Sequence, residues 1–212
     1  MSLAGLSIEE YARRLGSSDP TPGGGSASAV VGAMGASLVR MVALLTLESP
    51  KYAAVAARAG SIARDAETLA REFSRSVDED VTAFDKVSAA YKLPKQSDAE
   101  KAARTAAIQK ALRGACDPPL QAITLAHRTC ALAVELVDFG NPNAISDIGC
   151  AALFAQAAAR GAALNIAINA KALKDESEAG RVLARMTTSL AQVGLLAEVV
   201  NGKVKSAIGS RS

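Results

Sequence analysis

The segment TPGGGS joins a run of glycines to the start of an apolar helical pattern, a combination that suits ligand binding. Glycines let the backbone approach a ligand closely, and the first turn of a helix offers free N–H groups to an anion. The segment therefore predicts a ligand-cradling loop, although it lacks the lysine of a P-loop. It also fits a flexible turn in which Ser26 is the helix N-cap. The candidate binding residues are Thr21, Pro22, Gly23, Gly24, Gly25 and Ser26.

A carboxylate and a lysine lie near a second helical pattern. Asp80 is three residues after Val77 and four before Phe84, so a helix places it at the border of an apolar stripe. A carboxylate at such a border could serve as a base, or it could belong to a solvated face. Lys95 lies in the connection Leu93-Pro94-Lys95 between two predicted helices, where a lysine is usually exposed.

Amide and acidic residues gather in and after the segment GNPNAISDIG, which supplies Asn141, Asn143, Ser146 and Asp147. Asp147 and Asn165 are 18 residues apart, which is five helical turns, so they share one helix face. We expect this face to be buried, and amides there, including Asn169, need partners from protein, water or ligand. Structural and functional roles both remain open. The residues between Asp147 and Asn165 on this face are Ala151, Phe154, Ala158 and Ala162.

Several functions are disfavoured by composition. The one histidine and the three cysteines fit no metal-ligand spacing, so we expect no metal. The net charge is +3 and no basic run exceeds two residues, which is not typical of nucleic-acid binding. No signal peptide is visible, and the most apolar stretch, residues 27–47, contains Arg40. We therefore expect a cytoplasmic protein without a membrane partner, in which Arg40 needs an acidic or ligand partner or an exposed edge.

The elements that must position these residues are helices. Half of the 212 residues are hydrophobic, but aromatics are only 3% and 46 residues are alanine, the best helix former. Few β-branched or aromatic residues argue against strands. The pattern predicts one domain, residues 1–212, folded as an all-α, elongated antiparallel helical bundle. The expected helices are 7–16, 26–46, 51–91, 98–114, 118–139, 144–173 and 176–204.

Five stretches together resemble the cyclodeaminase/cyclohydrolase family, which includes the cyclodeaminase domain of formiminotransferase-cyclodeaminase and stand-alone methenyltetrahydrofolate cyclohydrolases. The resemblance covers about residues 5–205. The family often has GN-x-N-x-x-SDAG where this chain has GNPNAISDIG, and the difference leaves Asn141, Asn143 and Asp147 in place. The stretches are TPGGGSASAVVGAMGASLVRMVALLT (21–46), VDEDVTAFDKV (77–87), LPK with SDAEKAAR (93–104), GNPNAISDIG (140–149) and AALNIAIN (162–169).

The resemblance implies a homodimer in which helices of both subunits build the site. It implies a cyclohydrolase that hydrolyses 5,10-methenyltetrahydrofolate to 10-formyltetrahydrofolate in one-carbon metabolism, with no cofactor beyond the folate. One alternative is a formiminotetrahydrofolate cyclodeaminase that releases ammonia in histidine degradation. Another is a helical dimer that binds folate without turnover.

The same resemblance suggests roles for the candidate residues. Asp147 and Asp80 would be the carboxylates, one near the reacting carbon and one at the amino edge of the pterin. Lys95 would transfer a proton or orient the water or formyl oxygen. Asn165 and Asn169 would hydrogen-bond the pterin or the oxygen, and residues 21–26 would fit against the ligand. The wider substrate-binding set adds Arg40, Asn141, Asn143 and Ser146.

Overall fold

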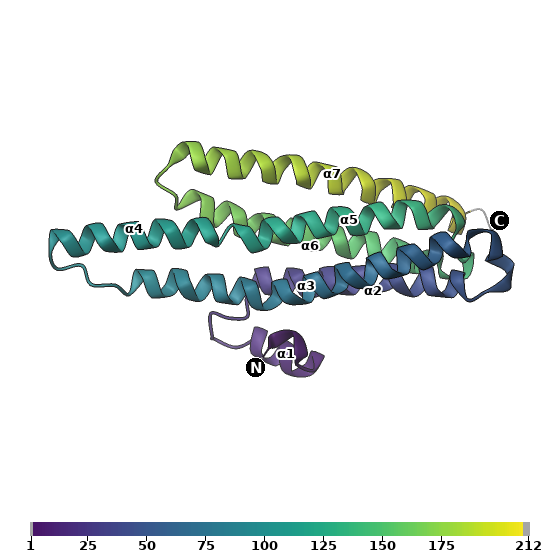
Figure 1. The fold of residues 1–212 in the computed structure, drawn as a ribbon, viewed down its shortest axis with the longest axis horizontal. Coiled ribbons are helices and arrows are strands. Elements are labelled where there is room, and N and C mark those ends of the chain that lie inside the picture. The colour runs from purple at the N-terminus through teal and green to yellow at the C-terminus, as the bar shows by residue number, and fades with distance from the viewer. Residues whose placement is uncertain (1, 210–212) are drawn as a thin grey trace.

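The computed structural model describes residues 2–209, and this part of the chain contains helices and no β-strand (Figure 1). The all-α prediction is confirmed. The α-helices are α1 (Ile8–Leu15), α2 (Gly24–Leu47), α3 (Ala56–Tyr91), α4 (Asp98–Gly114), α5 (Asp117–Phe139), α6 (Ile145–Lys171) and α7 (Glu176–Gly209). Short 3-10 helices are η1 (Leu3–Gly5), η2 (Pro50–Val55) and η3 (Pro142–Ala144).

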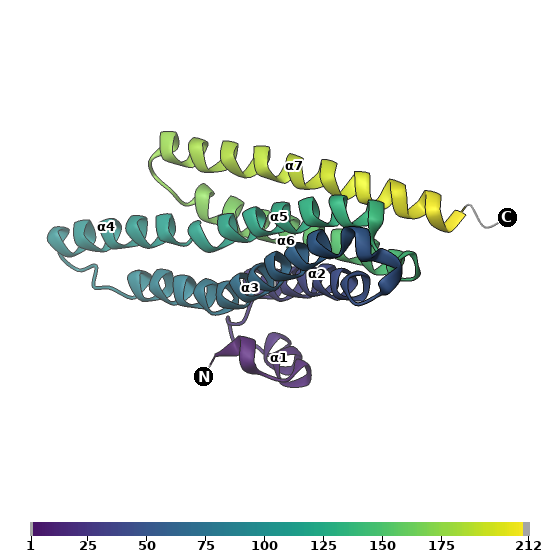
Figure 2. The same cartoon turned by 45° about the vertical axis from the view of Figure 1, so that its right-hand side comes forward.

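Long helices lie side by side and give the molecule its elongated shape (Figures 1 and 2). α2 packs between α3 and α6, and α5 and α7 cover the remaining sides of α6. The glycine contacts show that α2 and α6 are antiparallel, because Gly24 faces Asn165 while Gly35 faces Ala151. α4 and the end of α3 project beyond the bundle as a hairpin, and α1 lies outside it, beside α3 (Figure 2).

Capping residues account for several helix ends. The Ser97 hydroxyl accepts a hydrogen bond from the Glu100 N–H, and the Glu100 carboxylate accepts one from the Ser97 N–H, which completes a capping box at the start of α4. Ser7 caps α1 in the same way, but the Glu10 carboxylate binds Arg13 and Arg14 instead of closing the box. α4 therefore begins at Asp98 as predicted, and α1 begins at Ile8, one residue after its predicted start, without a closed capping box.

Small residues let the central helices approach closely. A Cβ added at Gly32 would lie 2.3 Å from the ring of Phe73, and one at Gly35 would lie 3.0 Å from the carbonyl oxygen of Ala151. The Phe73 side chain is fully buried. Close packing of this kind replaces the bulk that aromatic side chains supply in other cores.

Some predicted details are wrong. α2 begins at Gly24 with Gly23 as its N-cap, so Ser26 lies inside the first turn and is not the cap. α5 begins at Asp117, one residue before the predicted start at 118. Residues 50–55 form a 3-10 turn because Tyr52 has a non-helical backbone conformation, and α7 continues to Gly209. Phe154, expected on a buried face, has 37% of its surface exposed.

Three helical stretches are long and apolar enough to cross a membrane when up to two charged residues are tolerated. They are residues 24–47, 98–139 and 142–171, and between 39% and 56% of their most apolar windows is buried within the bundle. Part of the apolar surface of each stretch is therefore buried by packing against other helices.

Candidate functional site

The carboxylate of Asp80 lies at the N-terminus of α2. Gly23 has no side chain to cap this helix, and the Ser26 N–H donates a hydrogen bond to Asp80 on α3. A Cβ on Gly25 would lie 2.2 Å from Asp80 Oδ1, so only glycine leaves room for the carboxylate. Asp80 therefore caps α2 from a neighbouring helix, and its negative charge lies at the positive end of the helix dipole.

Partial burial makes Asp80 a better base than an exposed aspartate. Burial raises its pKa, and the hydrogen bond from the Ser26 N–H opposes part of that rise. A carboxylate with a raised pKa binds a proton more readily. The prediction that Asp80 borders the apolar stripe agrees with its half-buried position beside fully buried Val77.

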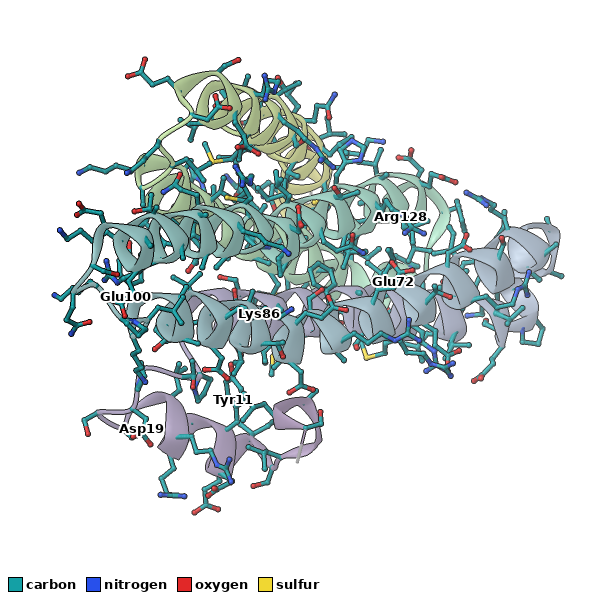
Figure 3. The ribbon with its side chains drawn as sticks, turned by 60° about the vertical axis from the view of Figure 1, so that its left-hand side comes forward. Tyr11, Asp19, Glu72, Lys86, Glu100 and Arg128 are labelled. Carbon is teal, nitrogen blue, oxygen red and sulfur yellow. The ribbon has the colours of Figure 1, made fainter. Side chains whose placement is uncertain are left out.

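Tyr11 connects α1 to the same helix start. Its hydroxyl lies 2.9 Å from the Ser26 Oγ, and Ser26 is fully buried. Burial raises the pKa of Tyr11, the Ser26 hydrogen bond lowers it, and the negative charge of Asp80 raises it further. Figure 3 shows Tyr11 on α1 between that helix and the bundle. Sequence reasoning did not select this residue, because the short helix α1 has no buried residue to mark its inner face.

α6 supplies Asn165 to this region. Its amide Nδ2 is 3.9 Å from where a Gly24 Cβ would lie, and it donates a hydrogen bond of 3.0 Å to the Gly161 carbonyl. Ser28 also lies at this crossing, where its hydroxyl donates to the Gly24 carbonyl at 2.7 Å. The structure thus brings Asn165 to the glycine segment. Asn169 instead donates to the Ala115 carbonyl at 2.9 Å, next to the junction of α4 and α5.

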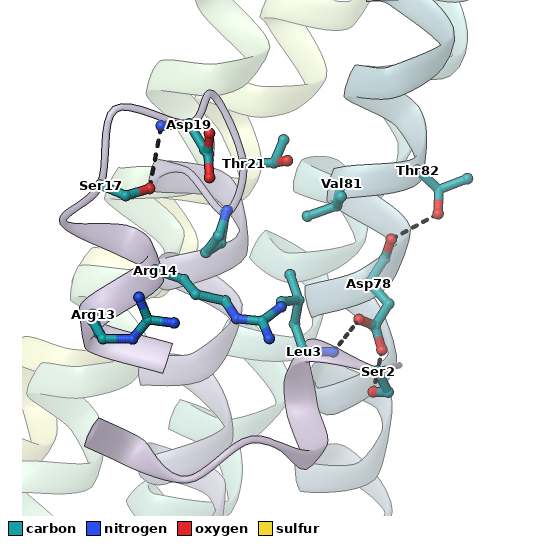
Figure 4. Close-up of a pocket in the computed structure, with 11 residues that line it drawn as sticks. Ser2, Leu3, Arg13, Arg14, Ser17, Asp19, Thr21, Asp78, Val81 and Thr82 are labelled. Carbon is teal, nitrogen blue, oxygen red and sulfur yellow. Dashed lines mark hydrogen bonds between the residues drawn. The ribbon is translucent and has the colours of Figure 1, made fainter. Parts of the chain in front are cut away.

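An open cleft of about 740 Å³ adjoins the glycine segment (Figure 4). The cleft lies between α1, the loop before α2, and α3, and the Asp78 carboxylate on its wall accepts a hydrogen bond from the Leu3 N–H. Thr21 and Pro22 border it, so solvent reaches the loop from this side. Its other lining residues include Arg13, Arg14, Asp19 and Thr82.

Residues 141–147 lie at the opposite end of α2. The Asn141 N–H donates to the Thr46 hydroxyl at 2.9 Å, and the Asn141 side chain accepts from the Asn143 N–H at 3.1 Å. α2 has 24 residues and is therefore about 35 Å long. Ser146 is exposed and Asp147 is half-buried in the first turn of α6. Within one chain, these residues are not near Asp80.

Lys95 and Arg40 also lie away from Asp80. Lys95 is exposed in the connection between α3 and α4, and no hydrogen bond or ion pair of its ammonium group is found within residues 2–209. Lys95 follows the end of α3, whose last eleven residues after Asp80 span about 17 Å. Arg40 forms a loose pair with Glu67 at 3.8 Å, so it has the acidic partner that the sequence required.

Residues 2–209 contain no group of three or more His, Cys, Asp or Glu side chains placed to hold a metal ion. Two of the cysteines are buried, and burial raises the pKa of Cys116 to about 11 and that of Cys130 to about 12. Cys150 is exposed on α6. The thiols at Cys116 and Cys130 are therefore protonated and unreactive at neutral pH.

The chain belongs to an all-α family of enzymes. The family model that matches, over residues 7–188, is described as formiminotransferase-cyclodeaminase. Over 201 residues the chain is 45% identical to a methenyltetrahydrofolate cyclohydrolase of Methylorubrum extorquens, covering 95% of this chain and 97% of that protein.

Two further relatives carry cyclodeaminase names. A formimidoyltransferase-cyclodeaminase of Sus scrofa is 32% identical over 97% of this chain, which spans only 38% of that longer protein. A crystal structure of formiminotetrahydrofolate cyclodeaminase from Thermotoga maritima superimposes with a TM-score of 0.86 at 29% identity, covering 96% of this chain and 98% of that one. The fold and its order of helices are thus those of the family.

Proposed function

We propose that this protein hydrolyses 5,10-methenyltetrahydrofolate to 10-formyltetrahydrofolate. The observation that carries this proposal is the 45% identity to the Methylorubrum enzyme, which extends over almost the full length of both chains. The half-buried Asp80 beside the glycine segment is consistent with it, because the reaction needs a base for water next to a cationic carbon.

The chemistry assigns complementary tasks to the candidate groups. Water attacks the amidinium carbon of the substrate and loses a proton to a base, and N5 must gain a proton before its bond to that carbon opens. A carboxylate stabilises the cationic substrate and accepts the proton of the water. Asp80 and Asp147 are the proposed carboxylates, Lys95 is the proposed proton donor, and Asn165 orients the pterin or the oxygen.

A homodimer would unite groups that one chain holds apart. α6 presents exposed apolar side chains at Leu164 and Ile168, which are 73% and 69% exposed, and at Leu153, which is 50% exposed. Exposed apolar side chains of this size along one helix are typical of a subunit interface. We infer that a second copy packs on this face of α6.

In an antiparallel pair of α6 helices, the start of one helix would lie beside the end of the other. Asp147 begins α6 and Asn165 lies 18 residues later, near Asp80, so the two ends are about 27 Å apart. A two-fold axis near the middle of α6 would bring Asp147 of the partner subunit towards the Asp80 end. The proposed site would then combine both subunits, and each dimer would contain two sites.

The second candidate function is the cyclodeaminase reaction, in which N10 of 5-formiminotetrahydrofolate attacks the formimino carbon and ammonia leaves. The structural match to the Thermotoga maritima protein favours it. Both reactions pass through a tetrahedral carbon between two nitrogens, so the same groups could support either. A folate-binding dimer without turnover is the remaining alternative.

Two parallel assays distinguish these functions. One follows the loss of methenyltetrahydrofolate absorbance, and the other follows ammonia release from 5-formiminotetrahydrofolate. Hydrolysis well above the uncatalysed rate, with little ammonia released, is the expected result. Rapid ammonia release with slow hydrolysis would favour the cyclodeaminase, and folate binding without either activity would favour the binding protein.

Mixing two inactive variants tests the shared site. Asp80→Ala and Asp147→Ala chains, unfolded and refolded together, should recover about a quarter of the wild-type rate, because half the dimers are mixed and each mixed dimer has one intact site. Each variant refolded alone is the control. No recovery, although mass spectrometry shows mixed dimers, would mean that Asp80 and Asp147 do not act together in a site shared between subunits.

A further inference from the structure

A contact between α1 and α2 lies directly behind the Asp80 carboxylate. The Tyr11 hydroxyl is 2.9 Å from the Ser26 Oγ, and the N–H of the same Ser26 donates to Asp80. Ser26 is fully buried. The Asp80 carboxylate occupies the space that a Cβ on residue 25 would fill, and this space is open because residue 25 is glycine. One residue, Ser26, therefore contacts Tyr11 through its side chain and Asp80 through its backbone.

The geometry points to Tyr11 as a positioning residue for Asp80, acting through Ser26. By holding the Ser26 hydroxyl in one orientation, the Tyr11 hydroxyl fixes the first turn of α2 against α3. That turn aims the Ser26 N–H at the carboxylate. The role goes beyond the proposed function in that it assigns a task to α1, and it rests on Asp80 being the base of that function.

The contact between Tyr11 and Ser26 matters because few charged groups face the Asp80 carboxylate. On α1, Tyr11 is the titratable group near it, and burial together with the charge of Asp80 keeps the phenol protonated. On α2, the facing turn of Gly24, Gly25 and Ser26 carries no charge. On α3, the adjacent Asp78 carboxylate accepts hydrogen bonds from Ser2 and Leu3 instead.

The facing turn of α6, residues 161–165, is also uncharged. Within residues 2–209, the Ser26 N–H is therefore the hydrogen-bond donor that opposes the effect of burial on Asp80. Loosening the Ser26 turn should weaken this hydrogen bond and favour the protonated carboxyl, since its burial remains.

Tyr11→Phe tests the proposal, because it removes one oxygen and keeps the ring. We expect kcat for methenyltetrahydrofolate hydrolysis to fall about two- to tenfold with KM unchanged, as for the loss of one hydrogen bond that acts through the base. The acid limb of the kcat profile should move to higher pH. Tyr52→Phe is the matched control, since Tyr52 lies in η2, at the end of α2 opposite to Asp80, and should leave the acid limb in place.

A mutant cycle separates positioning from a structural role. If Tyr11 acts through Ser26, adding Tyr11→Phe to Ser26→Ala should cause little further loss, so the effects should not multiply. Independent, multiplying effects would overturn the proposal. A lower melting temperature of Tyr11→Phe with an unmoved pH profile would overturn it as well.

Carboxyl NMR makes the outcome independent of turnover. The titration of Asp80 in the substrate-free protein should move to higher pH in Tyr11→Phe and stay unchanged in Tyr52→Phe. Absence of cyclohydrolase activity in the wild type would reject the proposed function, while this titration would still report on Tyr11. An unchanged Asp80 titration in Tyr11→Phe would reject the positioning role in either case.

Discussion

Gly25→Ala should impair the site far more than the stability of the bundle. The added Cβ would lie 2.2 Å from Asp80 Oδ1 and 2.6 Å from its Cγ, so the carboxylate must rotate away. The rotation breaks its hydrogen bond with the Ser26 N–H, and a bond to a charged group is worth about 1.5–3 kcal/mol. Two gains offset this loss: alanine favours a helix by about 0.5–1 kcal/mol over glycine, and Asp80 moves towards water.

The free energy of unfolding should therefore fall by no more than about 2 kcal/mol, which lowers Tm by about 8 °C at most in a chain of this size. Activity should fall much further, because a positioned base contributes roughly 10²–10⁴ to the rate. We expect kcat for methenyltetrahydrofolate hydrolysis to fall at least about a hundredfold. Calorimetry and steady-state kinetics on the same preparation measure both quantities.

Gly32→Ala is the control on the same helix. Its Cβ would lie 2.3 Å from Cε1 of Phe73, a ring that is fully buried and cannot rotate into solvent. Overpacking of this kind costs about 1–3 kcal/mol, while the folded fraction should keep its kcat. A Gly25→Ala protein with near wild-type kcat would refute the reasoning. So would a Gly25→Ala protein whose loss of activity is explained entirely by unfolding.

Three more outcomes follow from the structure. Because burial raises the pKa of Asp80, the folded state holds its proton more tightly than the unfolded state does. The free energy of unfolding should therefore fall as pH rises from the ordinary pKa of 3.8 through the raised pKa. In urea titrations Asp80→Asn should abolish this pH dependence, and the variant should melt no lower than wild type at pH 7 while losing activity. Iodoacetamide should leave Cys116 and Cys130 unlabelled in the native protein, since both are buried with raised pKa values, and intact-mass analysis showing rapid labelling of all three cysteines would contradict this. Ser97→Ala should lower the unfolding free energy by about 1 kcal/mol by removing the α4 cap, as calorimetry would detect, and an unchanged Tm would argue that the box contributes nothing.

Local sequence signals predicted most of the fold because they act within a few residues. Ser97 and Glu100 define the start of α4 through contacts three residues apart, and Gly16 ends α1. The position of Asp80 at the border of a buried stripe also follows from helical spacing alone. These features need no knowledge of which helices are neighbours.

The features that sequence reasoning missed depend on contacts between helices. Asp80 caps α2 although the two are distant in sequence, and Tyr11 reaches Ser26 only because the loop after α1 turns that helix onto the bundle. Asp147 and Asn165 do lie on the same face of one helix, but they are about 27 Å apart along its axis. Periodicity gives the direction of a side chain, whereas proximity also needs tertiary packing.

The alanine-rich core offers a physical reason for how polar groups enter it. At two helix crossings, a glycine leaves the space of a Cβ and an oxygen occupies that space. Asp80 Oδ1 lies 2.2 Å from the Cβ position of Gly25, and the Ser28 Oγ lies 2.1 Å from that of Gly161. Both oxygens have hydrogen-bond partners on α2, so their burial is compensated. Because each space is the size of a single methyl group, a substitution by alanine expels the oxygen even where the helices themselves do not move.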